Sequence, residues 1–140
     1  MLNTIIIDDE VNNVRFLQSL IEQHCPSVKI QATFTRPEDG INGIKTYQPD
    51  LLFLDIMMPN MSGFDVLDKV KDSSFDVIFT TAYKEYALEA LKHEAVDYLL
   101  KPIDYHELIQ AINKLLNRQH KQPSLKKLIE LYEDIKNTQE

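Results

Sequence analysis

Short apolar runs of strand length alternate along this sequence with segments in which apolar residues recur at helical spacing. The five runs that read as strands cover residues 4–7, 28–34, 51–54, 77–80 and 96–100. The helical segments between them carry their apolar residues at Val14, Leu17, Leu20 and Ile21, at Ile41 and Ile44, at Phe64, Leu67 and Val70, and at Ala87, Leu88 and Leu91. The pattern therefore predicts consecutive strand–helix units.

Strict alternation of strands and helices favours a parallel sheet, because a parallel neighbour needs a long crossover and both faces of the sheet must be covered. The runs 51–54 and 77–80 are apolar at almost every position, as expected for strands buried on both faces. We predict an α/β fold of the flavodoxin-like kind, a doubly wound (βα)5 parallel sheet with strand order 2-1-3-4-5.

The last predicted helix begins at Asp104, which is followed three residues later by Glu107 in a pattern typical of a capping box. Its apolar residues are Leu108, Ile112, Leu115 and Leu116. Beyond it, a polar stretch around Pro123 indicates a break, and a short helical seam follows at Leu125, Leu128, Tyr132 and Ile135. We therefore expect a domain at residues 1–120 and a linker helix at residues 121–140 that leads toward a further domain.

Charge and composition narrow the possible partners and the compartment. The 22 acidic and 15 basic residues give a net charge of −7, which disfavours binding of nucleic acid or an anionic membrane by this segment. The apolar run before Asp8 is too short for a signal peptide or a membrane span. The single cysteine, Cys25, cannot form an internal disulfide, as suits a reducing compartment. We expect a cytoplasmic protein.

The predicted strands end in residues that carry chemistry. Asp8 and Asp9 follow the first strand, Asp55 the third, Thr81 the fourth and Lys101 the fifth. In a sheet of this order, ligands bind beyond the carboxyl ends of the strands, at the crevice between the first and third strands. We therefore expect the three aspartates to converge there, although each of them has a simpler alternative role as a helix cap.

Converging carboxylates repel one another, and a hard divalent cation such as Mg²⁺ relieves that repulsion through oxygen ligands. With a metal and a cation in place, a carboxylate can act as a nucleophile and form an aspartyl-phosphate. Asp55 is the candidate nucleophile, because it is the single acid at the end of the central strand. Lys101 would supply positive charge, and Thr81 would supply a hydroxyl donor.

Four sequence blocks occur in the same order as in one known family: IIIDDE from Ile5, DIMMPNMSG from Asp55, TA from Thr81 and DYLLKP from Asp97. Together they resemble the receiver domains of bacterial two-component response regulators, over about residues 2–118. The resemblance implies that Asp55 accepts a phosphoryl group from a phosphohistidine on a sensor histidine kinase. It also implies that Asp8, Asp9, Asp55 and the Met57 carbonyl hold Mg²⁺, and that Lys101 contacts the phosphoryl group.

The same resemblance implies a conformational switch. Thr81 matches the switch hydroxyl, and Tyr98 matches the switch aromatic, whose ring rotates inward when the hydroxyl moves toward the phosphoryl group. The peptide bond before Pro102 resembles the cis bond of the family. We further expect phosphorylation to strengthen homodimer formation through the fourth helix, the fifth strand and the fifth helix.

The sequence between Val77 and Pro102 looks most like receivers of the LytTR class, whose full proteins carry a β-rich DNA-binding domain. This resemblance implies that the absent output domain binds DNA and regulates transcription. A stand-alone receiver that acts through protein–protein contacts is the alternative.

Two further positions bear on how long the switch stays on. Met57 lies two residues after Asp55, and Tyr83 lies two residues after Thr81. In receivers that dephosphorylate rapidly, these positions tend to carry polar or acidic side chains that orient water. Met57 offers no useful hydrogen bond and Tyr83 is bulky, so we expect slow hydrolysis.

An enzymatic role is disfavoured. An aspartyl phosphatase of the haloacid-dehalogenase kind would need a second aspartate where Met57 stands. A flavin carrier of the same topology would need phosphate-binding amides after the first strand, and the acidic run from Asp8 to Glu10 would repel a phosphate. We expect a signalling switch with limited phosphorylation chemistry of its own.

Overall fold

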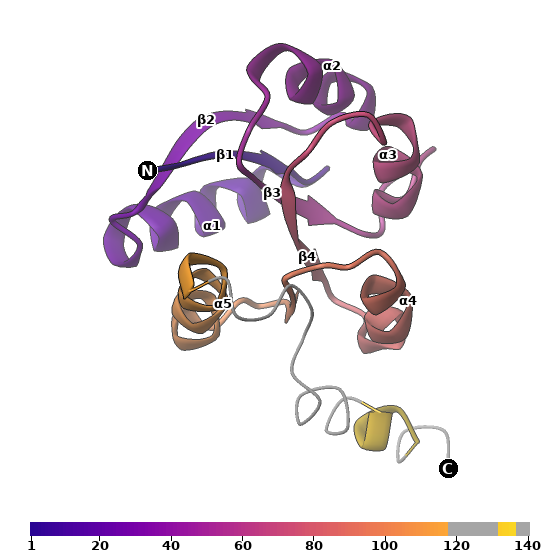
Figure 1. Cartoon of the computed structure of the whole chain (residues 1–140). Coiled ribbons are helices and arrows are strands. Elements are labelled where there is room, and N and C mark those ends of the chain that lie inside the picture. Colours follow the sequence, from indigo (N-terminus) through magenta and orange to yellow (C-terminus); the bar gives the residue numbers. More distant parts are fainter. Residues whose placement is uncertain (118–131, 137–140) are drawn as a thin grey trace.

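A computed structural model describes residues 1–117 and 132–136 of the 140-residue chain (Figure 1). The strands are β1 (Leu2–Ile7), β2 (Val28–Phe34), β3 (Leu51–Asp55), β4 (Asp76–Thr81) and β5 (Asp97–Leu100). The helices are α1 (Val11–His24), α2 (Pro37–Tyr47), α3 (Gly63–Lys69), the 3₁₀ turn η1 (Lys84–Tyr86), α4 (Ala87–Lys92) and α5 (Tyr105–Asn117). Every predicted strand and helix of residues 1–117 is confirmed, and η1 is an addition.

The strands of the described residues form one parallel sheet in the order β2-β1-β3-β4-β5, which confirms the predicted flavodoxin-like topology. Helices α1 and α5 cover one face of the sheet, and α2, α3 and α4 cover the other (Figure 1). Each face holds one apolar core. The fold is therefore a three-layer sandwich with the sheet in the middle.

Strand β3 lies at the centre of the sheet, and all of its residues are buried. Leu52 and Leu54 belong to the core beneath α2, α3 and α4, whereas Leu51 and Phe53 belong to the core beneath α1 and α5. Because successive side chains point to opposite faces of a strand, a strand covered on both sides must be apolar throughout. This arrangement brings Asp55, the last residue of β3, to the carboxyl edge of the sheet.

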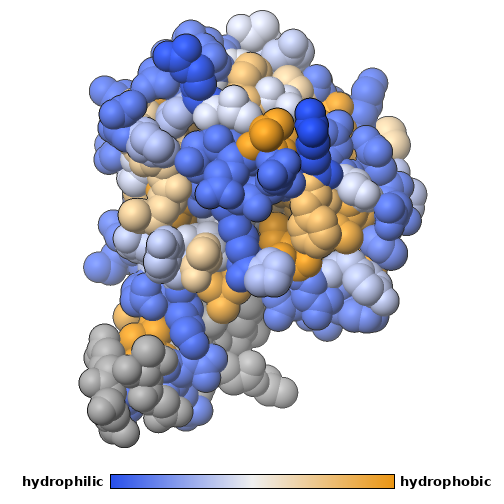
Figure 2. Space-filling view, turned by 180° about the vertical axis from the view of Figure 1, so that it is seen from behind, coloured by the Kyte–Doolittle hydropathy of each residue, from blue (hydrophilic) through white to orange (hydrophobic). Residues whose placement is uncertain are grey.

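Two leucines that the helical pattern placed on apolar faces are exposed instead. Leu88 of α4 is 51% exposed and Leu116 of α5 is 47% exposed. The buried residues of α4 are Ala87 and Ala90, so the small side chains of this short helix face the sheet. The side of the molecule in Figure 2 is mostly hydrophilic and carries separate apolar patches.

The helix caps differ in part from expectation. Asp104 does start α5, and its Oδ1 accepts a hydrogen bond of 2.8 Å from the backbone N–H of His106. A reciprocal capping box occurs at α3, where the Ser62 hydroxyl accepts from the Asp65 N–H and the Asp65 carboxylate accepts from the Ser62 N–H. The sequence pattern missed this box because aspartate stands where glutamate or glutamine is usual.

Half of the seam predicted beyond residue 120 lies outside the described residues, namely Leu125 and Leu128. The predicted domain boundary between residues 120 and 121 also lies outside them. Residues 132–136 are helical, and Tyr132 is exposed. The linker helix therefore stays a prediction.

Gly63, the first residue of α3, sets how closely that helix approaches the end of β3. A β-carbon added at Gly63 would lie 2.5 Å from the carbonyl oxygen of Asp55. That oxygen belongs to the main chain and cannot rotate away. A β-carbon added at Gly43 in α2 would overlap the outer edge of the Phe34 ring, which is half-buried and can turn.

We expect Gly63→Ala to lower the free energy of unfolding by about 1–3 kcal/mol, because it forces an overpacked contact against backbone. Gly43→Ala is the matched comparison and should cost less, since alanine is favoured over glycine inside a helix by about 1 kcal/mol. Urea unfolding of both variants measures the difference. Equal destabilisation would contradict the assignment of Gly63 as the tighter site.

Candidate functional site

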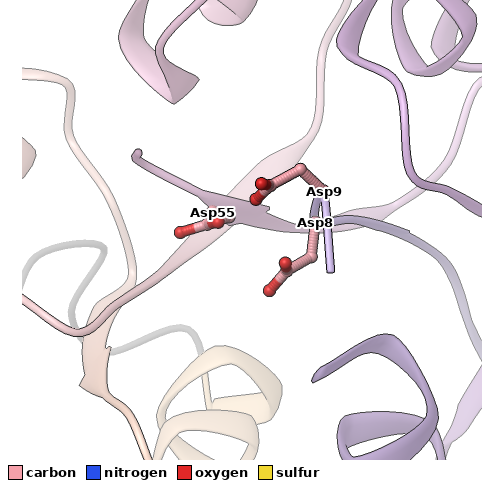
Figure 3. Close-up of side chains that lie close together, drawn as sticks. All are labelled: Asp8, Asp9 and Asp55. Carbon is pink, nitrogen blue, oxygen red and sulfur yellow. The ribbon is translucent and has the colours of Figure 1, made fainter. Parts of the chain in front are cut away.

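Three aspartates meet at the carboxyl edge of the sheet. Strands β1 and β3 pair in parallel with Ile7 opposite Leu54, so the residues that follow them are neighbours. Asp8, Asp9 and Asp55 each offer a carboxylate oxygen, and these oxygens lie within 4.8 Å of one another. Figure 3 shows Asp8 and Asp9 projecting from the end of β1 beside Asp55. The predicted convergence of the three acids is confirmed.

These aspartates do not cap the helices that follow them. The N-cap residue of α1 is Glu10, which makes no side-chain cap bond, and the N-cap residue of α3 is Ser62. Asp8 Oδ1 instead accepts a hydrogen bond of 2.9 Å from the backbone N–H of Glu10. This bond orients the Asp8 carboxylate within the cluster, so the simple capping role is ruled out for Asp8 and Asp55.

The electrostatics of the cluster favour a cation. Asp55 is only 3% exposed, and burial together with the negative charge of Asp8 raises the pKa of Asp55 to about 7, against the lowering effect of Lys101. Crowded carboxylate oxygens fit a hard divalent cation such as Mg²⁺, which binds through oxygen ligands. The carboxylates of Asp8, Asp9 and Asp55 could hold such an ion. That the Met57 carbonyl is a further ligand stays a prediction.

Lys101 faces the acids from the end of β5. Its Nζ lies 2.8 Å from Asp8 Oδ2 and 3.4 Å from Asp55 Oδ1. Burial lowers the pKa of Lys101, but the hydrogen bond to Asp8 and the negative charges of both aspartates outweigh burial and raise it overall. Lys101 is therefore a fixed ammonium group at the site. The bond between Lys101 and Pro102 is cis, as the resemblance implied.

Thr81 and Tyr98 are linked through the backbone of a third residue, Tyr83. The Thr81 Oγ1 accepts a hydrogen bond of 3.2 Å from the Tyr83 N–H, and the Tyr98 hydroxyl donates to the Tyr83 carbonyl oxygen. The Tyr98 ring lies inside the protein, with 1% exposed, and burial raises the pKa of its hydroxyl above the usual range. The predicted switch residues are thus in hydrogen-bonded contact through one residue.

A pocket of about 440 Å³ opens over the acids. It brings together most of the predicted site residues and adds four that sequence reasoning missed, namely Glu10, Asn13, Ala82 and Pro102. Met57 and Tyr83 line it with about half of their surface exposed, as expected of residues at its mouth. Tyr98 lies outside this pocket, behind Thr81.

A second pocket of about 270 Å³ adjoins the first and shares Asn13, Lys101 and Pro102 with it. Phe16 and Leu17 of α1 and Ile103 supply its apolar wall. In the sequence, the signal for this pocket is Phe16, an aromatic residue that lies outside the buried stripe of α1. In the structure, the Phe16 side chain is 48% exposed. An apolar hollow beside a reactive carboxylate suits a protein partner that must reach it.

Comparison with known proteins identifies the family. The sequence model of the response regulator receiver domain matches residues 4–113. The sensory transduction protein LytT of Bacillus anthracis is 33% identical over 132 residues, which cover 92% of this chain and 53% of that protein.

Among the residues that the structure describes, none of the helices has the length and apolar character that a membrane span requires.

Solved structures similar to this chain include response regulator domains. The response regulatory domain of the protein mrkE from Klebsiella pneumoniae is 30% identical, with a TM-score of 0.75, and the match covers 84% of this chain and 97% of that one. A chain of the CheX-CheY-BeF3-Mg²⁺ complex from Borrelia burgdorferi is 25% identical, with a TM-score of 0.74, and the match covers 82% of this chain and 89% of that one.

The chain spans about half the length of the curated relatives it matches, with shares of 51%, 48% and 53%. The match to the family model includes residues 4–7 of β1, the other four strands, the three aspartates, Thr81 and Lys101. The fold, the grouping of the acids and the family match agree, and we conclude that this chain belongs to the response regulator receiver domains of two-component signalling.

Proposed function

We propose that the domain is a phosphorylation switch in which Asp55 accepts a phosphoryl group from a phosphohistidine of a sensor histidine kinase. The observation that carries this proposal is the placement of the buried Asp55 carboxylate between two further acids and the ammonium group of Lys101. An Asp55 oxygen attacks phosphorus, the phosphorus–nitrogen bond of the phosphohistidine breaks, and the imidazole keeps the electron pair.

Asp8, Asp9, Asp55 and the Met57 carbonyl would hold Mg²⁺ in this proposal. The bound ion would offset the negative charge that the phosphoryl group brings to the acids. The related chain from Borrelia burgdorferi was solved in a complex with BeF3 and Mg²⁺, which supports a magnesium-dependent site. Burial and the negative charge of Asp8 raise the pKa of Asp55, and a bound cation would lower it again.

Lys101 and Thr81 have separate tasks. The Lys101 ammonium, already within 3.4 Å of Asp55, can bind an oxygen of the phosphoryl group. The Thr81 oxygen accepts from the Tyr83 N–H, which leaves its own proton free to donate to another phosphoryl oxygen. A shift of Thr81 toward that oxygen would pull on the Tyr83 backbone and hence on Tyr98.

The kinase would dock on the second pocket and present its phosphohistidine to the first. Asp55 lines the first pocket, and the apolar wall of Phe16, Leu17 and Ile103 belongs to the second, which shares Asn13, Lys101 and Pro102 with it. We propose no metabolic activity, because Met57 occupies the position at which an aspartyl phosphatase needs its second acid. We also propose a cytoplasmic location, which is typical of response regulators.

Asp55→Asn should abolish labelling by acetyl phosphate and Mg²⁺, because an amide is a poor nucleophile. Intact-mass spectrometry measures the addition of one phosphoryl group. Asp72→Asn, which changes an exposed acid of the loop after α3, is the matched control and should label normally. Chelation of the metal should stop labelling of the wild type. Labelling of the Asp55 variant at the wild-type level would overturn the site assignment.

Hydrolysis of the aspartyl-phosphate should be slow, because the exposed Met57 and Tyr83 side chains at the pocket mouth cannot orient water as an acid or amide would. The double variant Met57→Asn with Tyr83→Glu should shorten the lifetime of the label measurably, by about 10²-fold if water positioning contributes the lower end of general acid–base catalysis. Label decay after removal of acetyl phosphate gives the lifetime. An unchanged or longer lifetime in the double variant would contradict this role of both residues.

The output of the switch is proposed to be transcription regulation through a LytTR-type DNA-binding domain beyond residue 140. The similarity to LytT and the half-length coverage of the relatives support it. The net charge of −7 argues against DNA binding by the receiver itself. Residues 121–140 would then form the linker helix. A receiver that acts alone through protein contacts is the alternative.

Phosphorylation is further proposed to strengthen homodimer formation through α4, β5 and α5. Each of the two helices leaves a leucine exposed, Leu88 and Leu116, and β5 contains the switch residue Tyr98. Burial of such leucines in a second copy would be favourable, because each removes apolar surface from water.

Beryllofluoride with Mg²⁺, used as a phosphoryl mimic, should increase the mass measured by sedimentation, and Leu88→Asp should weaken this increase. Tyr47→Asp, at an equally exposed position at the end of α2, is the control and should associate like the wild type. An unchanged mass with and without the mimic would contradict the proposed surface.

A further inference from the structure

One contact joins the two loops on either side of Asp55. The Tyr86 hydroxyl donates a hydrogen bond of 3.0 Å to the Met57 sulfur. Met57 belongs to the loop after β3, whereas Tyr86 ends η1 in the segment after β4. Met57 lines the pocket over the acids, and Tyr86 is not among the residues that line it. Tyr86 therefore reaches the pocket through the Met57 side chain.

The Tyr86 ring is held from two sides by aromatic neighbours. Its centroid lies 6.3 Å from that of Phe64 and 6.4 Å from that of Tyr83, and the Tyr83 contact is edge-on. Phe64 is buried and packs in turn on Phe79 of β4, at a centroid distance of 5.1 Å. Such pairs favour fixed ring positions. The contact with Phe64 thus connects the Tyr86 ring to the core.

Met57 needs an anchor of this kind. Its side chain is unbranched and has three rotatable bonds, and 47% of it is exposed. Without a partner, the thioether would move among several staggered rotamers. A hydroxyl 3.0 Å from the sulfur favours the observed rotamer, in which Met57 lines the pocket over the acids.

We propose that Tyr86 is a positioning residue, which holds the apolar Met57 side chain in the wall of the pocket beside Asp55 and thereby limits attack of water on phosphorylated Asp55. This inference rests on the proposed function of Asp55. In the hydrolysis that it slows, a water oxygen attacks phosphorus, the bond from phosphorus to the Asp55 oxygen breaks, and the electron pair returns to the carboxylate. Both protons of the water leave with the inorganic phosphate. An apolar group in the pocket wall offers that water no strong hydrogen-bond partner.

Tyr86→Phe removes the hydroxyl and keeps the ring that packs on Phe64. The lifetime of the aspartyl-phosphate, formed with acetyl phosphate and Mg²⁺, should fall about two- to fivefold, as expected for one hydrogen bond of ordinary net strength. Tyr47→Phe removes a hydroxyl from an exposed tyrosine of α2 and should leave the lifetime unchanged. Urea unfolding of each variant confirms that the fold is intact.

A double-mutant cycle separates positioning from general packing. Leucine at position 57 lacks the sulfur acceptor, so Tyr86→Phe should have no further effect on the lifetime in a Met57→Leu background. The Met57 methyl resonance, followed by ¹³C NMR in the protein without phosphodonor or metal, should move toward the value of a freely rotating methionine in Tyr86→Phe. Comparison with Met57→Leu assigns that resonance.

Each outcome is decisive. If the wild type takes up no label, the proposed function of Asp55 fails and this inference fails with it. If the wild type is labelled but Tyr86→Phe matches its lifetime, only this inference is overturned. The same holds if Tyr86→Phe shortens the lifetime equally in the Met57→Leu background, because the hydroxyl would then act through another group.

Discussion

Repulsion among buried carboxylates is the constraint on which the rest of this structure depends. Asp55 ends a strand that is covered on both faces, so its carboxylate cannot turn away into solvent, and Asp8 and Asp9 are brought beside it by the pairing of β1 with β3. Lys101 offsets part of this charge. A further cation at this site would reduce the repulsion that remains among the carboxylates. This relief of repulsion would favour binding of the cation.

Main chain connects the carboxyl edge of the sheet to β5. The Tyr83 carbonyl oxygen accepts a hydrogen bond from the Tyr98 hydroxyl, and the Tyr83 N–H donates one to the Thr81 hydroxyl oxygen. The Tyr98 ring is buried in this arrangement. A displacement of Thr81 would therefore reach Tyr98 through two hydrogen bonds and the backbone of one residue.

The sequence predicted the sheet order and the grouping of Asp8, Asp9, Asp55 and Lys101, because strand ends are visible as changes from apolar to charged residues and parallel topology places those ends together. It could not predict the Tyr83 link or the Tyr86–Met57 contact. Both depend on loop conformation, which periodicity does not encode. Leu88 was assigned to a buried face because the pattern registers apolar residues, whereas the residues that α4 buries are its alanines, Ala87 and Ala90.

Helix α4 is joined to the rest of the fold by little apolar area. It has six residues, and the side chains that it buries are those of Ala87 and Ala90, whereas α5 buries two leucines and an isoleucine in addition to an alanine. Because the free energy of local opening grows with the apolar area that is exposed, α4 should detach or tilt at far lower energy than α5. We therefore expect the free energy of local opening to be lower for α4 than for α5. Amide hydrogens of α4 can then exchange by local opening while the sheet stays folded.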